Sequence, residues 1–118
     1  MRVAVVGLGS MGMGAATSCV AAGLTTYGID PRDTACEAFV TAGGAGAASD
    51  GRDFAGDLDA VILLTVNAAQ CRDALFGEKG LAAHLKAGTP VMVSATISVA
   101  DAKAIAAELE AVGLTMLD

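Results

Sequence analysis

The sequence has no tryptophan and little aromatic content of any kind, at 3% of its 118 residues. It is also short of basic residues, because seven Lys and Arg stand against 13 Asp and Glu, for a formal net charge of −6. Such an acidic chain is a poor partner for nucleic acid or an anionic membrane surface, so we expect neither. No apolar run reaches the roughly 20 residues of a membrane-spanning helix. The length suits one domain with its own core.

Cysteine is scarce as well, and its spacing is uninformative for metal binding. Cys19, Cys36 and Cys71 form no Cys-x-x-Cys pair and are odd in number. We therefore expect neither a disulfide framework nor a metal site, and predict free thiols in a reducing cytosol. The apolar stretch from Met1 to Ala22 resembles a secretion signal only superficially, because it has almost no basic segment and glycines interrupt it. The predicted location is cytoplasmic.

Small and aliphatic residues are abundant, and the clearest motif is rich in glycine. Gly7-Leu8-Gly9-Ser10-Met11-Gly12 fits the pattern G-x-G-x-x-G. Asp30 follows Gly12 by 18 positions, close to the spacing of about 20 that is typical of dinucleotide-binding folds. The segments around the motif predict a buried strand, a helix, a helix stop and a second strand, which are Arg2–Val6, Ser10–Ala22, Gly23 and Thr25–Ile29.

The chemistry of a bound dinucleotide explains these residue types. Gly7 allows a tight turn, Gly9 lets a pyrophosphate approach the backbone, and Gly12 lets the helix pack close to the sheet. The helix N-terminus offers N–H groups and partial positive charge to phosphates. Asp30 can accept hydrogen bonds from both hydroxyls of an adenosine ribose. The motif therefore predicts dinucleotide binding, although a methyltransferase fold that binds S-adenosylmethionine is an alternative with a similar acidic residue.

The choice between NAD and NADP depends on two residues after the second strand. Asp30 favours NAD, because the 2′-phosphate of NADP would bring about two negative charges against its carboxylate. Arg32 complicates this prediction, since an arginine just past the strand can pair with that phosphate. NAD is the predicted cofactor.

The rest of the chain alternates between strand-like and helical segments. Further strands are predicted within 43–48 and at Ala60–Thr65, Pro90–Ser94 and Leu114–Leu117. Further helices are predicted from Asp33 or Thr34 to Ala42 and at Asp50–Ala55, Ala68–Phe76, Leu81–Leu85 and Val99–Ala111, with Ser49, Asn67 and Ser98 as N-caps and Cys36, Phe39 and Val40 facing inward. This alternation predicts an α/β fold with a doubly wound parallel sheet, a Rossmann fold of strand order 3-2-1-4-5-6 over residues 1–118.

Several segments together resemble one family. The glycine motif with the following Met13-Gly14-Ala15-Ala16 resembles the opening of the β-hydroxyacid dehydrogenases, which include 3-hydroxyisobutyrate and 6-phosphogluconate enzymes. Leu64–Gln70, Val93–Ser98 and Thr115–Asp118 look closest to the L-threonate dehydrogenase branch. The resemblance covers essentially the whole chain. It implies an oxidoreductase that transfers a hydride from a small hydroxy acid, L-threonate or a similar sugar acid, to NAD.

The resemblance also implies site residues. Family residues that match Thr65 and Val66 lie beside the cofactor, and Thr96 matches a threonine near its nicotinamide end. Thr96 and Ser98 also fit the simpler role of helix capping. The predicted cofactor-binding residues are Gly7, Leu8, Gly9, Ser10, Met11, Gly12, Asp30, Arg32, Leu64, Thr65, Val66 and Thr96.

No catalytic residue is predicted within the chain. Family members continue into an all-helical domain that carries the catalytic lysine, so the resemblance implies that this lysine lies outside the 118 residues. Lys79, Lys86 and Lys103 are predicted to be solvated surface away from the cofactor crevice, and His84 to have no function. We therefore expect an NAD-binding domain that is inactive alone and forms a homo-oligomer in the full protein. A freestanding module that senses NAD(H) without chemistry is the alternative.

Overall fold

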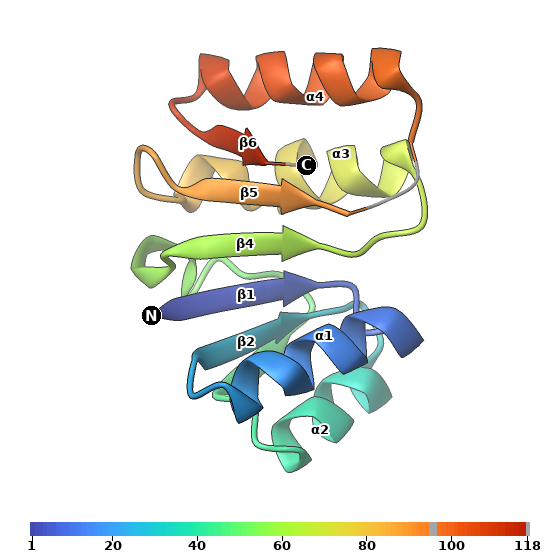
Figure 1. The fold of residues 1–118 in the computed structure, drawn as a ribbon, viewed down its shortest axis with the longest axis vertical. Coiled ribbons are helices and arrows are strands. Elements are labelled where there is room, and N and C mark those ends of the chain that lie inside the picture. Colours follow the sequence, from blue (N-terminus) through green and yellow to red (C-terminus); the bar gives the residue numbers. More distant parts are fainter. Residues whose placement is uncertain (95–96, 118) are drawn as a thin grey trace.

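The structure is a computed structural model that describes residues 1–94 and 97–117. Within that part of the chain, a six-stranded parallel sheet has the order β3-β2-β1-β4-β5-β6, as predicted (Figure 1). The strands are β1 (Arg2–Val6), β2 (Thr25–Ile29), β3 (Gly46–Ala48), β4 (Ala60–Leu63), β5 (Pro90–Val93) and β6 (Thr115–Leu117). Because neighbouring strands run parallel, their carboxyl ends meet at one edge of the sheet.

Helices cover both faces of this sheet. The described helices are α1 (Ser10–Ala21), α2 (Asp33–Thr41), α3 (Ala68–Phe76) and α4 (Val99–Ala111), with single 3-10 turns η1 (Ala55–Asp57) and η2 (Ala82–His84). α1 and α2 lie over β1 and β2 (Figure 1) and bury Ala16 and Phe39 there against Val5. α3 and α4 lie on the opposite face. Successive β1 residues therefore point into different cores, which explains the continuous apolar run of this strand.

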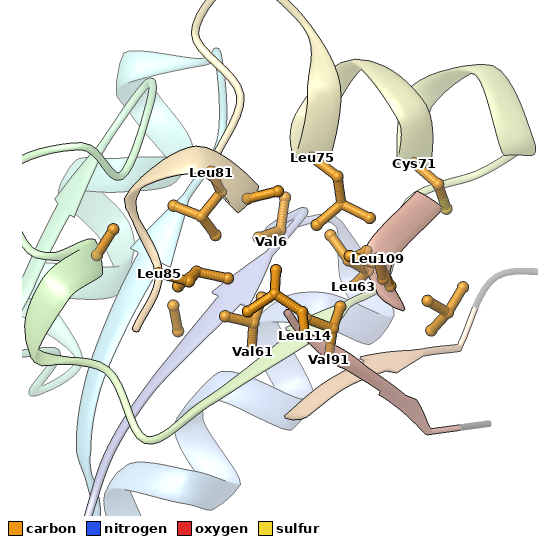
Figure 2. Close-up of a cluster of buried hydrophobic side chains, with 14 of the residues drawn as sticks. Val6, Val61, Leu63, Cys71, Leu75, Leu81, Leu85, Val91, Leu109 and Leu114 are labelled. Carbon is orange, nitrogen blue, oxygen red and sulfur yellow. The ribbon is translucent and has the colours of Figure 1, made fainter. Parts of the chain in front are cut away.

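The larger core lies between the sheet, α3 and α4. Figure 2 shows Cys71 and Leu75 of α3 directed at a cluster of aliphatic side chains from the strands and from the η2 segment. The strand residues Val6, Val61, Leu63 and Val91 are all buried there, as is Leu109 of α4. This packing fixes the central strands, and it thereby fixes the edge at which their carboxyl ends converge.

Capping residues in the sequence correctly predicted where two of the helices begin. The side chain of Asn67 accepts a hydrogen bond from the N–H of Gln70 at 2.9 Å, and Ser98 accepts one from Asp101 at 3.1 Å. Both are therefore N-caps, as predicted. The prediction of Leu81–Leu85 as a helix is too long, because only the η2 turn forms there.

The predicted helix at Asp50–Ala55 is wrong. That segment forms only a single turn, in which the N–H of Ala55 donates to the carbonyl of Gly51 at 2.8 Å, and it leads into η1 without a cap from Ser49. Tertiary packing decides this, because a Cβ at Gly51 would lie 2.6 Å from the side chains of Ile29 and Leu81, so the loop backbone is pressed against the core. Phe54 in the same loop stacks on the ring of Tyr27, with centroids 4.5 Å apart.

The prediction of an inward face on α2 is also wrong in part. Phe39 is fully buried, but the side chain of Val40 is 48% exposed. The helix begins at Asp33, and Arg32 is its N-cap residue without a side-chain cap bond. Phe39 is fully buried in the core between α1 and the sheet, because the small residues Gly28 and Gly44 leave room for its ring, and Ala35 packs beside this core.

Candidate dinucleotide-binding site

A cleft of about 790 Å³ lies at the carboxyl ends of the central strands. Val6 pairs with Ile29 of β2 and Leu63 of β4, so the residues that follow these three strands emerge side by side. From the predicted set, the cleft is lined by Gly7 and Gly9 after β1, Asp30 and Arg32 after β2, and Leu64, Thr65 and Val66 after β4. The sheet register therefore brings together segments that are up to 59 residues apart in the sequence.

The other predicted residues lie elsewhere. Leu8 is buried and packs in the smaller core, although its backbone N–H faces Asp30. Ser10 and Met11 are exposed at the start of α1, and Gly12 is buried beneath the glycine turn. None of these four residues lines the cleft. Thr96 lies outside the described residues.

Each glycine of the motif has a different geometric constraint. Gly7 has φ +94°, which L side chains rarely adopt, and a Cβ there would lie 2.7 Å from the carbonyl oxygen of Leu64. A Cβ at Gly12 would collide with the carbonyl oxygen of Gly7 at 1.6 Å. A Cβ at Gly9 meets nothing within 4 Å. The fold therefore requires glycine at Gly7 and Gly12, whereas the space beside Gly9 is open.

Asp30 is the most heavily bonded side chain at the cleft. Its carboxylate is 4% exposed and receives the backbone N–H groups of Leu8 at 2.8 Å and Arg32 at 2.9 Å. The guanidinium of Arg32 donates through Nε to Oδ1 at 2.9 Å and through Nη2 to Oδ2 at 3.0 Å. These bonds, with the Arg32 side chain the largest contributor, lower the pKa of Asp30 from 3.8 to about 2 despite its burial. The carboxylate thus ties the glycine turn to the end of β2.

This lowered pKa predicts a loss of stability in acid. A carboxyl group whose pKa is lower in the folded state stabilises the fold fully above its unfolded value of 3.8, and this contribution is lost as the pH falls toward 2. The shift corresponds to about 2 kcal/mol. Asp30→Asn should therefore reduce the unfolding free energy at pH 7, and the gap from wild type should close between pH 4 and pH 2 in urea denaturation. Parallel curves for the two proteins over that range would contradict this role.

Several cleft residues were missed by sequence reasoning. Ser49 and Asp50 follow β3, and Gln70 and Asp73 lie on α3. A usable signal for one of them is that Asp50-Gly51-Arg52 repeats the Asp-x-Arg pattern of residues 30–32, again shortly after a strand. In both copies the arginine pairs with the aspartate two residues before it.

The prediction for Lys79 is wrong in part, because its side chain is exposed as expected but is not away from the cleft. This lysine lines the cleft, because the turn after α3 folds back and the N–H of Leu81 donates to the carbonyl of Ala74. Lys86 pairs with Asp59 at 3.3 Å, away from the cleft. Lys103 lies on α4 and lines a separate hollow. His84 is exposed in η2.

Thiol and metal chemistry would be alternatives to nucleotide binding. The three cysteines are free, and the buried thiol of Cys71 contacts the hydroxyl of Thr65 at 2.8 Å. Among the described residues, no group of three His, Cys, Asp or Glu side chains is placed to hold a metal ion. No helix in the described part of the chain is both long enough and apolar enough to cross a membrane.

The strand order and the G-x-G-x-x-G turn between β1 and α1 define a dinucleotide-binding domain of the Rossmann type. The chain belongs to the family described as the NAD binding domain of 6-phosphogluconate dehydrogenase, whose model matches residues 2–118. This membership confirms NAD as the predicted cofactor. It also confirms the resemblance to the β-hydroxyacid dehydrogenases.

Individual relatives agree with this family. The chain is 59% identical over 116 residues to the L-threonate dehydrogenase of Haemophilus influenzae, covering 98% of this chain and 38% of the relative. It is 54% identical to the L-threonate dehydrogenase of Escherichia coli strain K12, covering 99% and 39%. The solved 3-hydroxyisobutyrate dehydrogenase of Salmonella typhimurium superposes with a TM-score of 0.94 at 54% identity, covering 100% of this chain and 41% of that one. The chain therefore spans about two fifths of the length of these relatives.

Proposed function

We propose that this chain is the NAD-binding domain of a dehydrogenase that transfers a hydride from a small hydroxy acid, L-threonate or a similar sugar acid, to NAD. The observation that carries the proposal is the glycine turn that lines the cleft, together with the hydrogen bond from its backbone to Asp30. The identity of 54–59% to L-threonate dehydrogenases supports the substrate class. When bound, NAD supplies a hydride acceptor in its nicotinamide ring.

The binding roles follow from the chemistry of the cleft. The turn from Gly7 to Gly9 and the N-terminus of α1 suit the pyrophosphate, because N–H groups and helix dipole charge favour an anion there. Asp30 suits the hydroxyls of the adenosine ribose, because a carboxylate is an acceptor with two oxygens. Leu64, Thr65 and Val66 form the wall beyond β4 and suit the rest of the cofactor. The cleft volume lies within the range of roughly 300–1,000 Å³ for ligand pockets.

Titration of the purified chain tests this function. In calorimetry we expect NAD to bind, NADP to bind at least about tenfold more weakly, and S-adenosylmethionine not to bind. The preference for NAD has an electrostatic cause, since the 2′-phosphate would face the ionised carboxylate of Asp30. Equal affinities for NAD and NADP would contradict the assigned ribose contact. Binding of S-adenosylmethionine alone would replace the proposal with a methyltransferase.

The same preparation should form no NADH with L-threonate or related hydroxy acids. Proton abstraction needs a base within hydrogen-bond reach of the substrate hydroxyl. We propose that this base belongs to the remaining part of the dehydrogenase, because Lys86 is paired with Asp59 and Lys103 lies outside the cleft. Lys79 lines the cleft, so its role as a base is tested separately. Steady turnover at roughly 1–10³ s⁻¹ would contradict the proposal, and its loss in Lys79→Met would identify that lysine as the base.

A further inference from the structure

The carboxylate of Asp30 has no free acceptor position for a ribose. A carboxylate offers about four lone-pair sites, and here four N–H groups occupy them. Two of these donors are backbone groups, from Leu8 and Arg32, and they are held by the glycine turn and by the start of α2. The other two belong to the guanidinium of Arg32, whose side chain is 59% exposed. Only the guanidinium can leave without unfolding the turn.

We propose that Arg32 is a specificity-determining residue that competes with the ribose of NAD for Asp30 and, once displaced, faces the 2′ position of the nucleotide. The inference rests on the proposed NAD site and adds to it a residue that sets the preference between NAD and NADP. An NAD ribose must break both side-chain bonds of Arg32 to reach Oδ1 and Oδ2, so the pair lowers NAD affinity. A 2′-phosphate is instead attracted by the displaced guanidinium, which offsets part of its repulsion by the carboxylate. Arg32 therefore reduces the preference for NAD over NADP in two ways, because it lowers the affinity for NAD and raises the affinity for NADP.

Arg52 provides a matched comparison within the same chain. It stands two residues after Asp50, and its backbone N–H and Nε both lie 3.2 Å from Oδ1 of that carboxylate. This pair lacks a bond from the glycine turn, and the Arg52 side chain does not line the cleft. A change of Arg52 removes the same charge from the same side of the molecule without freeing Asp30. It therefore separates local competition from a general effect of net charge.

The test compares dissociation constants for NAD and NADP among the wild type, Arg32→Gln and Arg52→Gln by calorimetry. Arg32→Gln should tighten NAD binding about threefold, since the guanidinium that competes with the ribose is 59% exposed and is therefore held only weakly. It should weaken NADP about tenfold, because the 2′-phosphate loses its charged donor. Arg52→Gln should change each affinity less than about twofold.

Arg32→Lys keeps the charge without the guanidinium fork and covers the case in which Arg32→Gln does not fold. It should bind NAD more tightly than the wild type, as Arg32→Gln does. Its affinity for NADP should fall less than that of Arg32→Gln. The inference is overturned if both Arg32 variants melt like the wild type and bind NAD equally or more weakly. It is also overturned if Arg52→Gln, like Arg32→Gln, tightens NAD binding and weakens NADP binding. A wild type that binds neither nucleotide contradicts the proposed function itself, which distinguishes that failure from a failure of the Arg32 role.

Discussion

Gly9→Val is expected to weaken NAD binding by at least about a hundredfold while the free chain stays folded. The valine side chain would project from the turn at the place that we assign to the pyrophosphate, so it would remove the close backbone approach. The free fold should accept it, since φ at Gly9 is −70° and a Cβ there meets nothing within 4 Å. Valine is a poorer N-cap than glycine, which should cost at most about 1 kcal/mol of unfolding free energy.

Gly14→Val is the matched control for this prediction. Gly14 is exposed on α1, a Cβ there also has open space, and the residue does not line the cleft. The control should therefore bind NAD as the wild type does, with a modest helix-propensity effect on stability. Both variants would be measured by NAD titration and by thermal melting. A change of less than threefold in the NAD affinity of Gly9→Val would show that the turn does not hold the pyrophosphate.

Gly12→Ala is expected to have the largest effect on folding, with a loss of about 3 kcal/mol or more in unfolding free energy. The added Cβ would lie 1.6 Å from the carbonyl oxygen of Gly7 and 2.7 Å from its carbonyl carbon. Both atoms are backbone, so the clash can be relieved only if α1 moves away from the end of β1. Overpacking that forces backbone shifts typically costs 1–3 kcal/mol, and domains are stable by only about 5–15 kcal/mol.

Urea denaturation of Gly12→Ala and Gly9→Ala would check the contrast between the two glycines. Both variants add the same methyl group, and only its surroundings differ. The methyl group at Gly12 meets backbone atoms, and the one at Gly9 meets open space. Gly9→Ala should remain within about 1 kcal/mol of the wild type. An unfolding free energy for Gly12→Ala in that same range would mean that the helix does not pack against the turn as described.

The sheet order was predictable because the signals for it are local or periodic. The β-branched runs in β1 and β4 are continuous, which is typical of strands buried on both faces, and both strands lie at the centre of the sheet. Asn67 and Ser98 start their helices through bonds to residues only three positions away. Parallel strands joined by helices then leave few topologies, because such crossovers are right-handed.

The loop around Gly51 shows where local reasoning failed. Its residues permit a short helix, but Gly51 is pressed against Ile29 and Leu81, and Phe54 stacks on Tyr27. None of these partners lies close in sequence to the loop. Lys79 was misplaced for a different reason, because the turn after α3 is closed by a short-range hydrogen bond from the N–H of Leu81 to the carbonyl of Ala74, which brings the chain back toward the cleft.

The sequence by itself determined the strand order, the glycine turn and the presence of an acidic residue beyond β2. Periodicity, capping and glycine spacing are properties of neighbouring residues, so they can be read without coordinates. Only the tertiary structure decided what Asp30 contacts and which side chains complete the cleft. The bond from Leu8 to Asp30 arises because the sheet register places the ends of β1 and β2 side by side. Distances between separate strand ends are set by packing of the whole domain, which no local pattern contains.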